Sequence, residues 1–289
     1  MSNSLTEPIK QRLNRLLGQP VTAQEKVVGG YTPAARWRIH TNAGSYFAKI
    51  GSTPLTTSLL RREARAYEAI EGSFMPQFFG WDDDEAAPLL VIEDLSTAHW
   101  PPPWDRKMVD AVLAQLEVLH NTVANVPTLA EIWGEQPDKD WLKVAQDPEP
   151  FLGLGLVDGD WLETHLPLLL EMEEKCEEAG TAVTHGDIRS DNLCITASGV
   201  KLIDWPEACL SNPRLDLGFW LPSLAYESDI LPETILSNAP EVAARVAGYF
   251  AARAGLPVIL DAPFVRRVQR QQLNTALPWA IRALNLPAK

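Results

Sequence analysis

Three oxygen-bearing side chains in the second half of the chain stand at spacings that suit chemistry on a phosphate ester. Residues 184–192 read THGDIRSDN, so Asp187 follows a His-Gly pair and Asn192 lies five positions later. A strand-like stretch at residues 200–203 then ends at Asp204. Phosphoryl transfer from a metal nucleotide needs a carboxylate facing the acceptor hydroxyl and oxygen ligands for magnesium. This order predicts Asp187 as the acceptor-facing carboxylate, and Asn192 and Asp204 as ligands of Mg²⁺.

These residues also carry a resemblance to a known family. HGDIRSDN at residues 185–192, LIDW at 202–205 and PRLDL at 213–217 resemble the motifs of aminoglycoside phosphotransferase and choline kinase-like enzymes. The resemblance covers nearly the whole chain and implies an α+β, protein-kinase-like fold of two lobes. Residues 1–95 would form a small antiparallel-sheet N-lobe that binds nucleotide. Residues 96–289 would form a larger, mainly helical C-lobe with the catalytic loop, the metal site and the acceptor-binding helices. ATP as co-substrate and Mg²⁺ as cofactor follow from the same resemblance.

A lysine on an early strand has an expected partner on the next helix. Lys49 lies in the strand pattern of residues 45–50, and residues 58–71 follow as a helix. The apolar face of that helix consists of Leu59, Ala66, Tyr67 and Ile70. Glu63 projects onto the middle of this face, where an unpaired carboxylate costs several kcal/mol. We therefore expect an ion pair between Lys49 and Glu63, and the resemblance implies that it aims the lysine at the α- and β-phosphates.

The resemblance implies that two further segments bind the nucleotide. Gly29 and Gly30 lie in an expected hairpin over residues 27–39, and their backbone amides would face the phosphates. The strand at residues 88–95 would lead into the hinge, where the Glu93 carbonyl and the Leu95 amide would bond adenine. From the residues alone, an ordinary hairpin turn and an ordinary strand end remain open alternatives.

The catalytic loop contains three further candidates. Arg189 either stabilises charge near the γ-phosphate or forms a surface ion pair, and both readings stay open. His185 is expected to fix the turn through hydrogen bonds rather than carry protons. By resemblance, Asp216 would brace the loop by accepting backbone hydrogen bonds. The catalytic residues are therefore predicted as Asp187 and Arg189, with His185 and Asp216 in support.

The segment after the catalytic loop separates classes of kinase. Gly186 stands where regulated protein kinases carry an arginine, and only eleven residues separate Asp204 from Asp216. That is too short for a long activation segment. This segment therefore favours a small-molecule kinase, and the resemblance implies that its acceptor is a hydroxyl of an aminoglycoside-, amino-alcohol- or sugar-like compound. The alternatives are a nucleotide-binding pseudokinase or regulatory module, and an atypical protein kinase.

Composition limits the partners of the protein. A formal net charge of −13 disfavours nucleic acid and anionic membranes, and mildly favours an amine-bearing acceptor. Three cysteines without a CxxC spacing disfavour a disulfide framework or a structural zinc site. No signal peptide or membrane span is evident, so a cytoplasmic location is expected. The acidic run at residues 171–178 is expected to cover a solvated helix face. The oligomeric state is not indicated.

Overall fold

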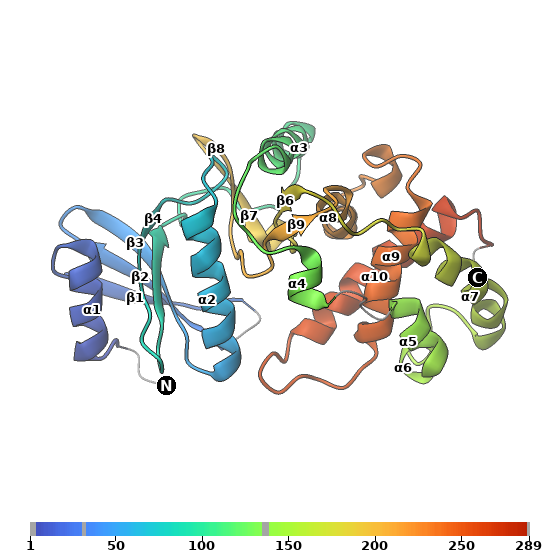
Figure 1. The fold of residues 1–289 in the computed structure, drawn as a ribbon, viewed down its shortest axis with the longest axis horizontal. Helices are drawn as coiled ribbons and strands as arrows, with labels where there is room; N and C mark the ends of the chain where they lie inside the picture. Colours follow the sequence, from blue (N-terminus) through green and yellow to red (C-terminus); the bar gives the residue numbers. More distant parts are fainter. Residues whose placement is uncertain (1–3, 31–32, 135–138, 288–289) are drawn as a thin grey trace.

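The computed structural model describes residues 4–30, 33–134 and 139–287, and Figure 1 shows them as two parts side by side. The N-terminal part contains a five-stranded antiparallel sheet in the order β1-β2-β3-β5-β4. Its strands are β1 (Ala23–Val27), β2 (Ala35–Thr41), β3 (Gly44–Ile50), β4 (Phe78–Asp82) and β5 (Leu89–Glu93). The expected hairpin is thus present as β1 and β2, although its turn residues Tyr31 and Thr32 lie outside the described residues.

Two helices cover the two faces of this sheet (Figure 1). The first, α1 (Glu7–Leu17), buries Leu13 completely and ends at Gly18 in the left-handed conformation. The second, α2 (Pro54–Ala69), begins at a capping box between Thr53 and Thr56, which satisfies amides that lack intrahelical partners. With both faces covered, the first four residues of β5 (89–92) are buried, which explains why they are all apolar.

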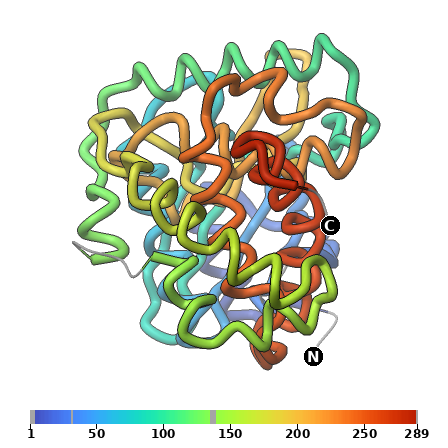
Figure 2. The backbone as a smooth tube through the Cα atoms, turned by 90° about the vertical axis from the view of Figure 1, so that its right-hand side faces the viewer, coloured from blue at the N-terminus to red at the C-terminus, as the bar shows by residue number. Residues whose placement is uncertain are grey.

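The C-terminal part is mainly helical, and Figure 2 views it end-on with the blue N-terminal sheet behind it. Its helices are α3 (Arg106–His120), α4 (Leu129–Trp133), α5 (Asp140–Gln146), α6 (Glu149–Leu152), α7 (Gly159–Glu174), α8 (Arg214–Glu227), α9 (Pro240–Ala254) and α10 (Val265–Ala283). Two short antiparallel ladders pair β6 (Ala182–Thr184) with β9 (Cys209–Ser211), and β7 (Leu193–Thr196) with β8 (Gly199–Leu202). Single 3₁₀ turns occur at η1 (Ser190–Asn192) and η2 (Pro232–Thr234).

Helix α9 is the centre of the helical part. It packs against α5, α6, α7, α8 and α10, and its alanine-rich sequence lets these neighbours approach closely. Nine of its residues are buried, so this helix has almost no solvent face. The predicted fold class is confirmed: a small antiparallel-sheet part is joined to a larger helical one.

The expectation of a solvated acidic face at residues 171–178 is wrong at Glu173. This side chain is fully buried, and its carboxylate accepts the backbone N–H groups of Asp140 at 3.0 Å and Trp141 at 2.9 Å. The first amides of a helix have no intrahelical acceptor. Glu173 therefore satisfies the start of α5 from across the fold, a contact that charge patterning could not indicate.

Candidate active site

The turn after β6 positions the first candidate carboxylate. Gly186 has a φ of 78°, and a Cβ atom there would lie 2.5 Å from the carbonyl oxygen of Glu207. A side chain at this position would meet both backbone strain and a steric clash. Glycine therefore lets the chain turn sharply and present Asp187 directly after it.

Asp216 supports this turn from the first turn of α8. Its Oδ2 accepts the N–H of His185 at 2.9 Å, and its Oδ1 accepts the N–H of Gly186 at 2.9 Å. Nε2 of His120 donates to the same carboxylate at 3.0 Å, and Asp216 is only 1% exposed. The predicted bracing contacts are present, and they hold the backbone of the turn rather than facing open solvent.

His185 is held in one tautomer by two hydrogen bonds. Nε2 donates to the carbonyl oxygen of Ile203 at 2.9 Å, while Nδ1 accepts the N–H of Asp187 at 3.3 Å. Its ring packs against Trp205 with 4.4 Å between centroids. Burial lowers the pKa of His185 below its ordinary value. A neutral imidazole with a hydrogen bond at each nitrogen thus links the turn before Asp187 to the backbone of Ile203. This agrees with the expectation that His185 fixes the turn through hydrogen bonds.

Asp187 has two side-chain partners in the loop. Nη1 of Arg189 lies 2.6 Å from Oδ1, and Nδ2 of Asn192 donates to Oδ2 at 3.0 Å. Burial, opposed by the charge of Arg189 and reinforced by that of Asp204, raises the pKa of Asp187 to about 7. About a third of the side chain remains exposed (35%), so the group can be reached from the cavity beside it.

Arg189 forms ion pairs with two carboxylates in the same loop. Besides Asp187, it contacts Asp191 with 3.0 Å between Nε and Oδ1. Its side chain is 17% exposed, so it lies in the site rather than out on the surface. The ion pair that was one of the two interpretations of Arg189 is therefore present. It lies inside the site rather than on the surface, and it orients the Asp187 carboxylate.

Asn192 and Asp204 offer a small oxygen donor set. Nδ2 of Asn192 donates to the carbonyl oxygen of Asp187 at 2.9 Å as well as to its carboxylate, which leaves the amide oxygen directed away from these contacts. Asp204 follows β8 with a φ of 68° and 41% of its side chain exposed. No group of three or more His, Cys, Asp or Glu side chains suited to a metal occurs in the described part. Two protein oxygens completed by substrate phosphates fit Mg²⁺.

The predicted partner of Lys49 is in place. Nζ of Lys49 lies 2.7 and 2.9 Å from the two carboxylate oxygens of Glu63, and 3.0 Å from Oδ1 of Asp204. Lys49 and Glu63 are only 5% and 2% exposed. Although burial opposes it, these two negative charges raise the pKa of Lys49. Conversely, and again against burial, the charge and hydrogen bond of Lys49 lower the pKa of Asp204 to about 2. Both groups are therefore charged at neutral pH.

A second cation accompanies Lys49 and was missed in the sequence. Arg36 on β2 is the register partner of Lys49 on β3, so both side chains leave the same face of the sheet. Nη1 of Arg36 donates to the carbonyl oxygen of Gly29 at 3.0 Å, and its charge helps to lower the pKa of Asp204. Gly29 and Gly30 both have positive φ values, 144° and 75°. The sequence did contain a signal for this contact. Residues 35–41 alternate as a strand, and Arg36 stands opposite Lys49 once β2 pairs with β3.

The expected hinge follows β5. Oε2 of Glu93 accepts the N–H of Gln77 at 3.1 Å. Leu95 is buried, and its carbonyl oxygen accepts the N–H of Ala98 and the indole N–H of Trp100. The segment is thus held in an ordered, non-helical conformation. The adenine contacts expected of Glu93 and Leu95 stay a prediction.

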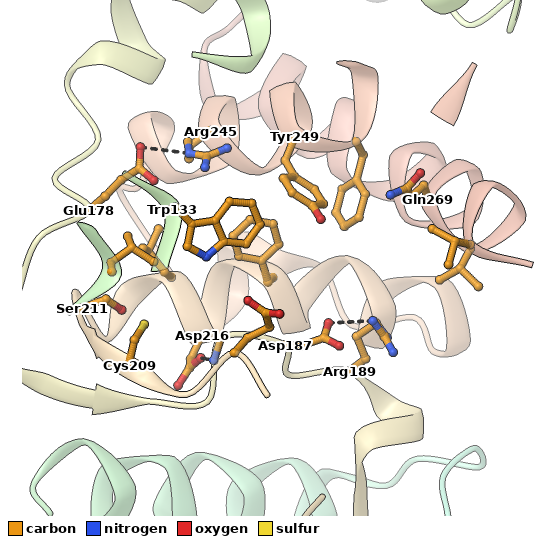
Figure 3. A pocket seen from close by; sticks show the side chains of 18 residues that line it. Trp133, Glu178, Asp187, Arg189, Cys209, Ser211, Asp216, Arg245, Tyr249 and Gln269 are labelled. Carbon is orange, nitrogen blue, oxygen red and sulfur yellow. Dashed lines mark hydrogen bonds and ion pairs between the residues drawn. The ribbon is translucent and has the colours of Figure 1, made fainter. Parts of the chain in front are cut away.

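A cavity of about 290 Å³ opens beside Asp187 in the helical part, and Figure 3 shows the side chains around it. Its charged and polar lining consists of Glu178, Asp187, Arg189, Glu207, Ser211, Asp216, Arg245 and Gln269. Its aromatic lining consists of Trp133, Phe219, Tyr249 and Phe250. Except for the loop residues, sequence reasoning did not identify this lining. The only signal was the number of tryptophans in the helical half.

Comparison with known proteins places these features in a family. The family model described as "Phosphotransferase enzyme family" (APH) matches residues 24–257. The chain belongs to this family. Its membership confirms the predicted family and the prediction that the protein is a phosphotransferase. No curated protein matches the chain significantly in sequence. Within the described ranges, no helix combines the length and hydrophobicity needed to cross a bilayer.

Solved structures show the same fold at low sequence identity. A thermostable mutant of aminoglycoside phosphotransferase APH(4)-Ia, in complex with ADP and hygromycin B, has a TM-score of 0.60 at 13% identity, covering 94% of this chain and 98% of that one. Choline kinase LicA from Streptococcus pneumoniae has a TM-score of 0.58 at 15% identity, covering 96% and 97%. Spectinomycin phosphotransferase APH(9)-Ia, in complex with ADP and spectinomycin, has a TM-score of 0.59 at 12% identity, covering 99% and 100%.

Proposed function

We propose that this phosphotransferase transfers the γ-phosphoryl group of ATP to a hydroxyl of a small molecule, with Mg²⁺ as cofactor. One observation carries the proposal. Nζ of Lys49 lies 3.0 Å from Oδ1 of Asp204, although the two residues are 155 positions apart. This contact brings the cation of the sheet to the carboxylate that follows the catalytic loop. The charge of Asp204 also helps to raise the pKa of Asp187. The proposed phosphate-binding group, metal ligand and acceptor-facing carboxylate would then share one site, as phosphoryl transfer requires.

On the nucleotide side, Lys49 held by Glu63 would bind the phosphates, with Arg36 as a second cation. The backbone amides of Gly29 and Gly30 would face the same phosphates, while the backbone of Glu93 and Leu95 would bond the base. Backbone and lysine N–H groups stabilise phosphate charge by hydrogen bonding, and they form no covalent bond to the substrate.

Asn192 and Asp204 would hold Mg²⁺, which neutralises phosphate charge when bound. Asp187 would accept the proton of the acceptor hydroxyl, and a pKa raised to about 7 places this carboxyl near the working pH of a general base. Arg189, at 2.6 Å, would orient that carboxylate and stabilise charge that develops on the transferred group. His185 and Asp216 would keep the loop in this shape.

The similar solved structures guide the choice of acceptors for a first test, since two of them are complexes with hygromycin B or spectinomycin and the third is a choline kinase. We therefore propose an aminoglycoside-, amino-alcohol- or sugar-like hydroxyl compound as acceptor. ADP release would be measured with Mg-ATP across a panel of these three classes.

The same panel would be run with Asp187→Asn and with Asp110→Asn, an exposed carboxylate on α3. Loss of a general base lowers turnover by about 10²–10⁴-fold, so Asp187→Asn should abolish acceptor-dependent ADP release while Asp110→Asn leaves it unchanged. Equal turnover in both variants would contradict the assignment of Asp187. Binding of Mg-ATP without turnover of any acceptor would favour a pseudokinase, and phosphate incorporated into protein would favour a protein kinase.

A further inference from the structure

Two carboxylates on the wall of the cavity are already neutralised by cations. Glu178 contacts Nζ of Lys139 and Nε of Arg245, each at 3.1 Å. Glu207 accepts from Nη2 of Arg62 at 2.8 Å. Their side chains are only 13% and 23% exposed. Because a partly buried ion pair loses much of its energy when one partner is drawn away, these acids are poor sites for a ligand cation.

The two carboxylates on the floor of the cavity are engaged as well. Asp187 contacts Arg189 and Asn192, and Asp216 accepts two backbone N–H groups and Nε2 of His120. Among the described lining residues, every carboxylate therefore has a partner, and two arginines face the same space. Ammonium groups of a polycation would be desolvated there without an available counter-charge, which is unfavourable.

The remaining wall is aromatic. Tyr249 packs edge-to-face against Phe219 and Phe250, with ring centroids 5.2 Å apart in both pairs. The guanidinium carbon of Arg253 lies 3.9 Å from the centroid of Tyr249, so a cation already occupies one face of that ring. Trp133 is 44% exposed, and Figure 3 shows it and Tyr249 projecting into the same space. The exposed indole of Trp133 therefore offers a face on which a flat apolar group can stack.

The size of the cavity sets the size of that group. Its volume of about 290 Å³ is near the lower end of the range for small-molecule sites, about 300–1,000 Å³. Val265 and Val268 of α10 continue the apolar lining, and Phe264 beside them in the chain is 51% exposed. Gln269 supplies an amide for orientation. One or two rings fit this space, whereas most of a larger polyamine sugar would lie outside it.

We infer that the acceptor is an uncharged hydroxyl compound of one or two rings, with an apolar ring that stacks against Trp133 and Tyr249. This inference rests on the proposed phosphotransfer, because the cavity is treated as the place where the acceptor hydroxyl meets Asp187. It narrows the acceptor to the neutral, sugar-like class and excludes polycationic aminoglycosides. The chain has an excess of acidic residues, but each carboxylate among the described lining residues of the cavity has a partner.

The test compares two neutral probes that differ only in an apolar ring with a third probe that is polycationic. Phenyl β-D-glucoside and methyl β-D-glucoside carry the same hydroxyls and differ in the apolar ring, whereas kanamycin supplies several ammonium groups. Binding would be measured by titration calorimetry with a non-hydrolysable Mg-nucleotide present. An ionic strength of about 0.15 M limits attraction of kanamycin to the net negative surface. The variants are Trp133→Ala and, as control, Tyr226→Ala, whose ring is 50% exposed and outside the cavity lining.

The phenyl glucoside should bind at least about fivefold more tightly than the methyl glucoside, since stacking of its ring adds to the binding free energy. Trp133→Ala should remove this advantage, and Tyr226→Ala should preserve it. Kanamycin binding more tightly than the phenyl glucoside would overturn the inference. Absence of ring-dependent binding, or equal binding by Trp133→Ala and wild type, would overturn it too.

Failure of this inference differs from failure of the proposed function. Turnover of kanamycin with ADP release would keep the phosphotransfer and overturn the neutral acceptor. Binding of the phenyl glucoside that depends on Trp133, in a protein that does not bind Mg-ATP, would keep the ligand class and overturn the phosphotransfer.

Discussion

Replacing Lys49 by methionine should test whether the buried ion pair is organised as the structure indicates. Lys49 lies 2.7 Å from Glu63 and 3.0 Å from Asp204, and both members of the Lys49–Glu63 pair are almost excluded from water. Methionine keeps most of the volume of the lysine stem and removes the charge. The variant therefore leaves Glu63 as a buried carboxylate whose cation is gone.

The expected costs differ between the single and double variants. Removing one partner of a buried pair costs about 3–5 kcal/mol, so Lys49→Met should lower the free energy of unfolding by about that amount. Glu63→Gln should cost less, about 1–3 kcal/mol, because Lys49 keeps Asp204 as a partner. The double variant Lys49→Met/Glu63→Leu should recover much of the loss, since apolar residues often replace a buried pair at little cost.

The destabilisation by Lys49→Met should depend on pH. Burial raises the pKa of Glu63 even in the presence of Lys49, and loss of that cation raises it further. A carboxyl whose folded pKa lies above its unfolded value favours the folded state at low pH, and this contribution is lost as the pH rises through the folded pKa. The cost of Lys49→Met should therefore be larger at about pH 8 than at about pH 5.

Urea unfolding followed by circular dichroism at both pH values would measure these differences. Arg106→Met is the matched control, because Arg106 pairs with Asp110 at 2.9 Å on α3 with both side chains more than half exposed. An exposed pair of this kind contributes about 0.3–0.5 kcal/mol. If Lys49→Met cost no more than Arg106→Met, or if its cost were the same at both pH values, the burial argument would be refuted.

Three further predictions concern individual contacts. Gly186→Ala should lower the free energy of unfolding by about 1–3 kcal/mol and reduce turnover, because its φ of 78° and the nearby carbonyl of Glu207 leave no place for a methyl group; melting and ADP release would measure both effects, and an unchanged protein would contradict the turn geometry. Asp187→Asn should stabilise the nucleotide-free protein more at pH values above 7 than below, because the raised pKa of the carboxyl makes its ionised form unfavourable in the fold; a melting-temperature difference that stays constant across this range would show that the fold does not raise this pKa. Glu173→Ala should lower the free energy of unfolding by about 2–4 kcal/mol, because the N–H groups of Asp140 and Trp141 lose their acceptor. Urea unfolding would measure this loss, and a curve that matched wild type would show that water replaces the carboxylate.

Local spacing explains why the grouping of side chains in the loop after β6 could be predicted. His185, Asp187 and Asn192 lie within eight positions, so the short spacing already places their side chains near one another, and Asp216 holds the turn. Periodicity also placed Glu63 on the apolar face of its helix, and pairing with Lys49 follows from the cost of burying a lone carboxylate. The same kind of reasoning was wrong at Glu173, because a glutamate in an acidic run looks solvated unless a distant helix start needs an acceptor.

The sequence by itself thus determined the fold class and the family through the motifs that resemble those of known phosphotransferases. Short-range spacing and helical periodicity determined which residues meet in the loop after β6 and in the Lys49–Glu63 pair. The tertiary structure alone decided where the cavity beside Asp187 lies and what chemistry lines it. Trp133, Phe219 and Tyr249 come from α4, α8 and α9, which are far apart in the chain. An aromatic residue on a helix gives the same periodic signal whether it faces a packed core or an open cavity. Only the arrangement of α4, α8 and α9 in space distinguishes the two.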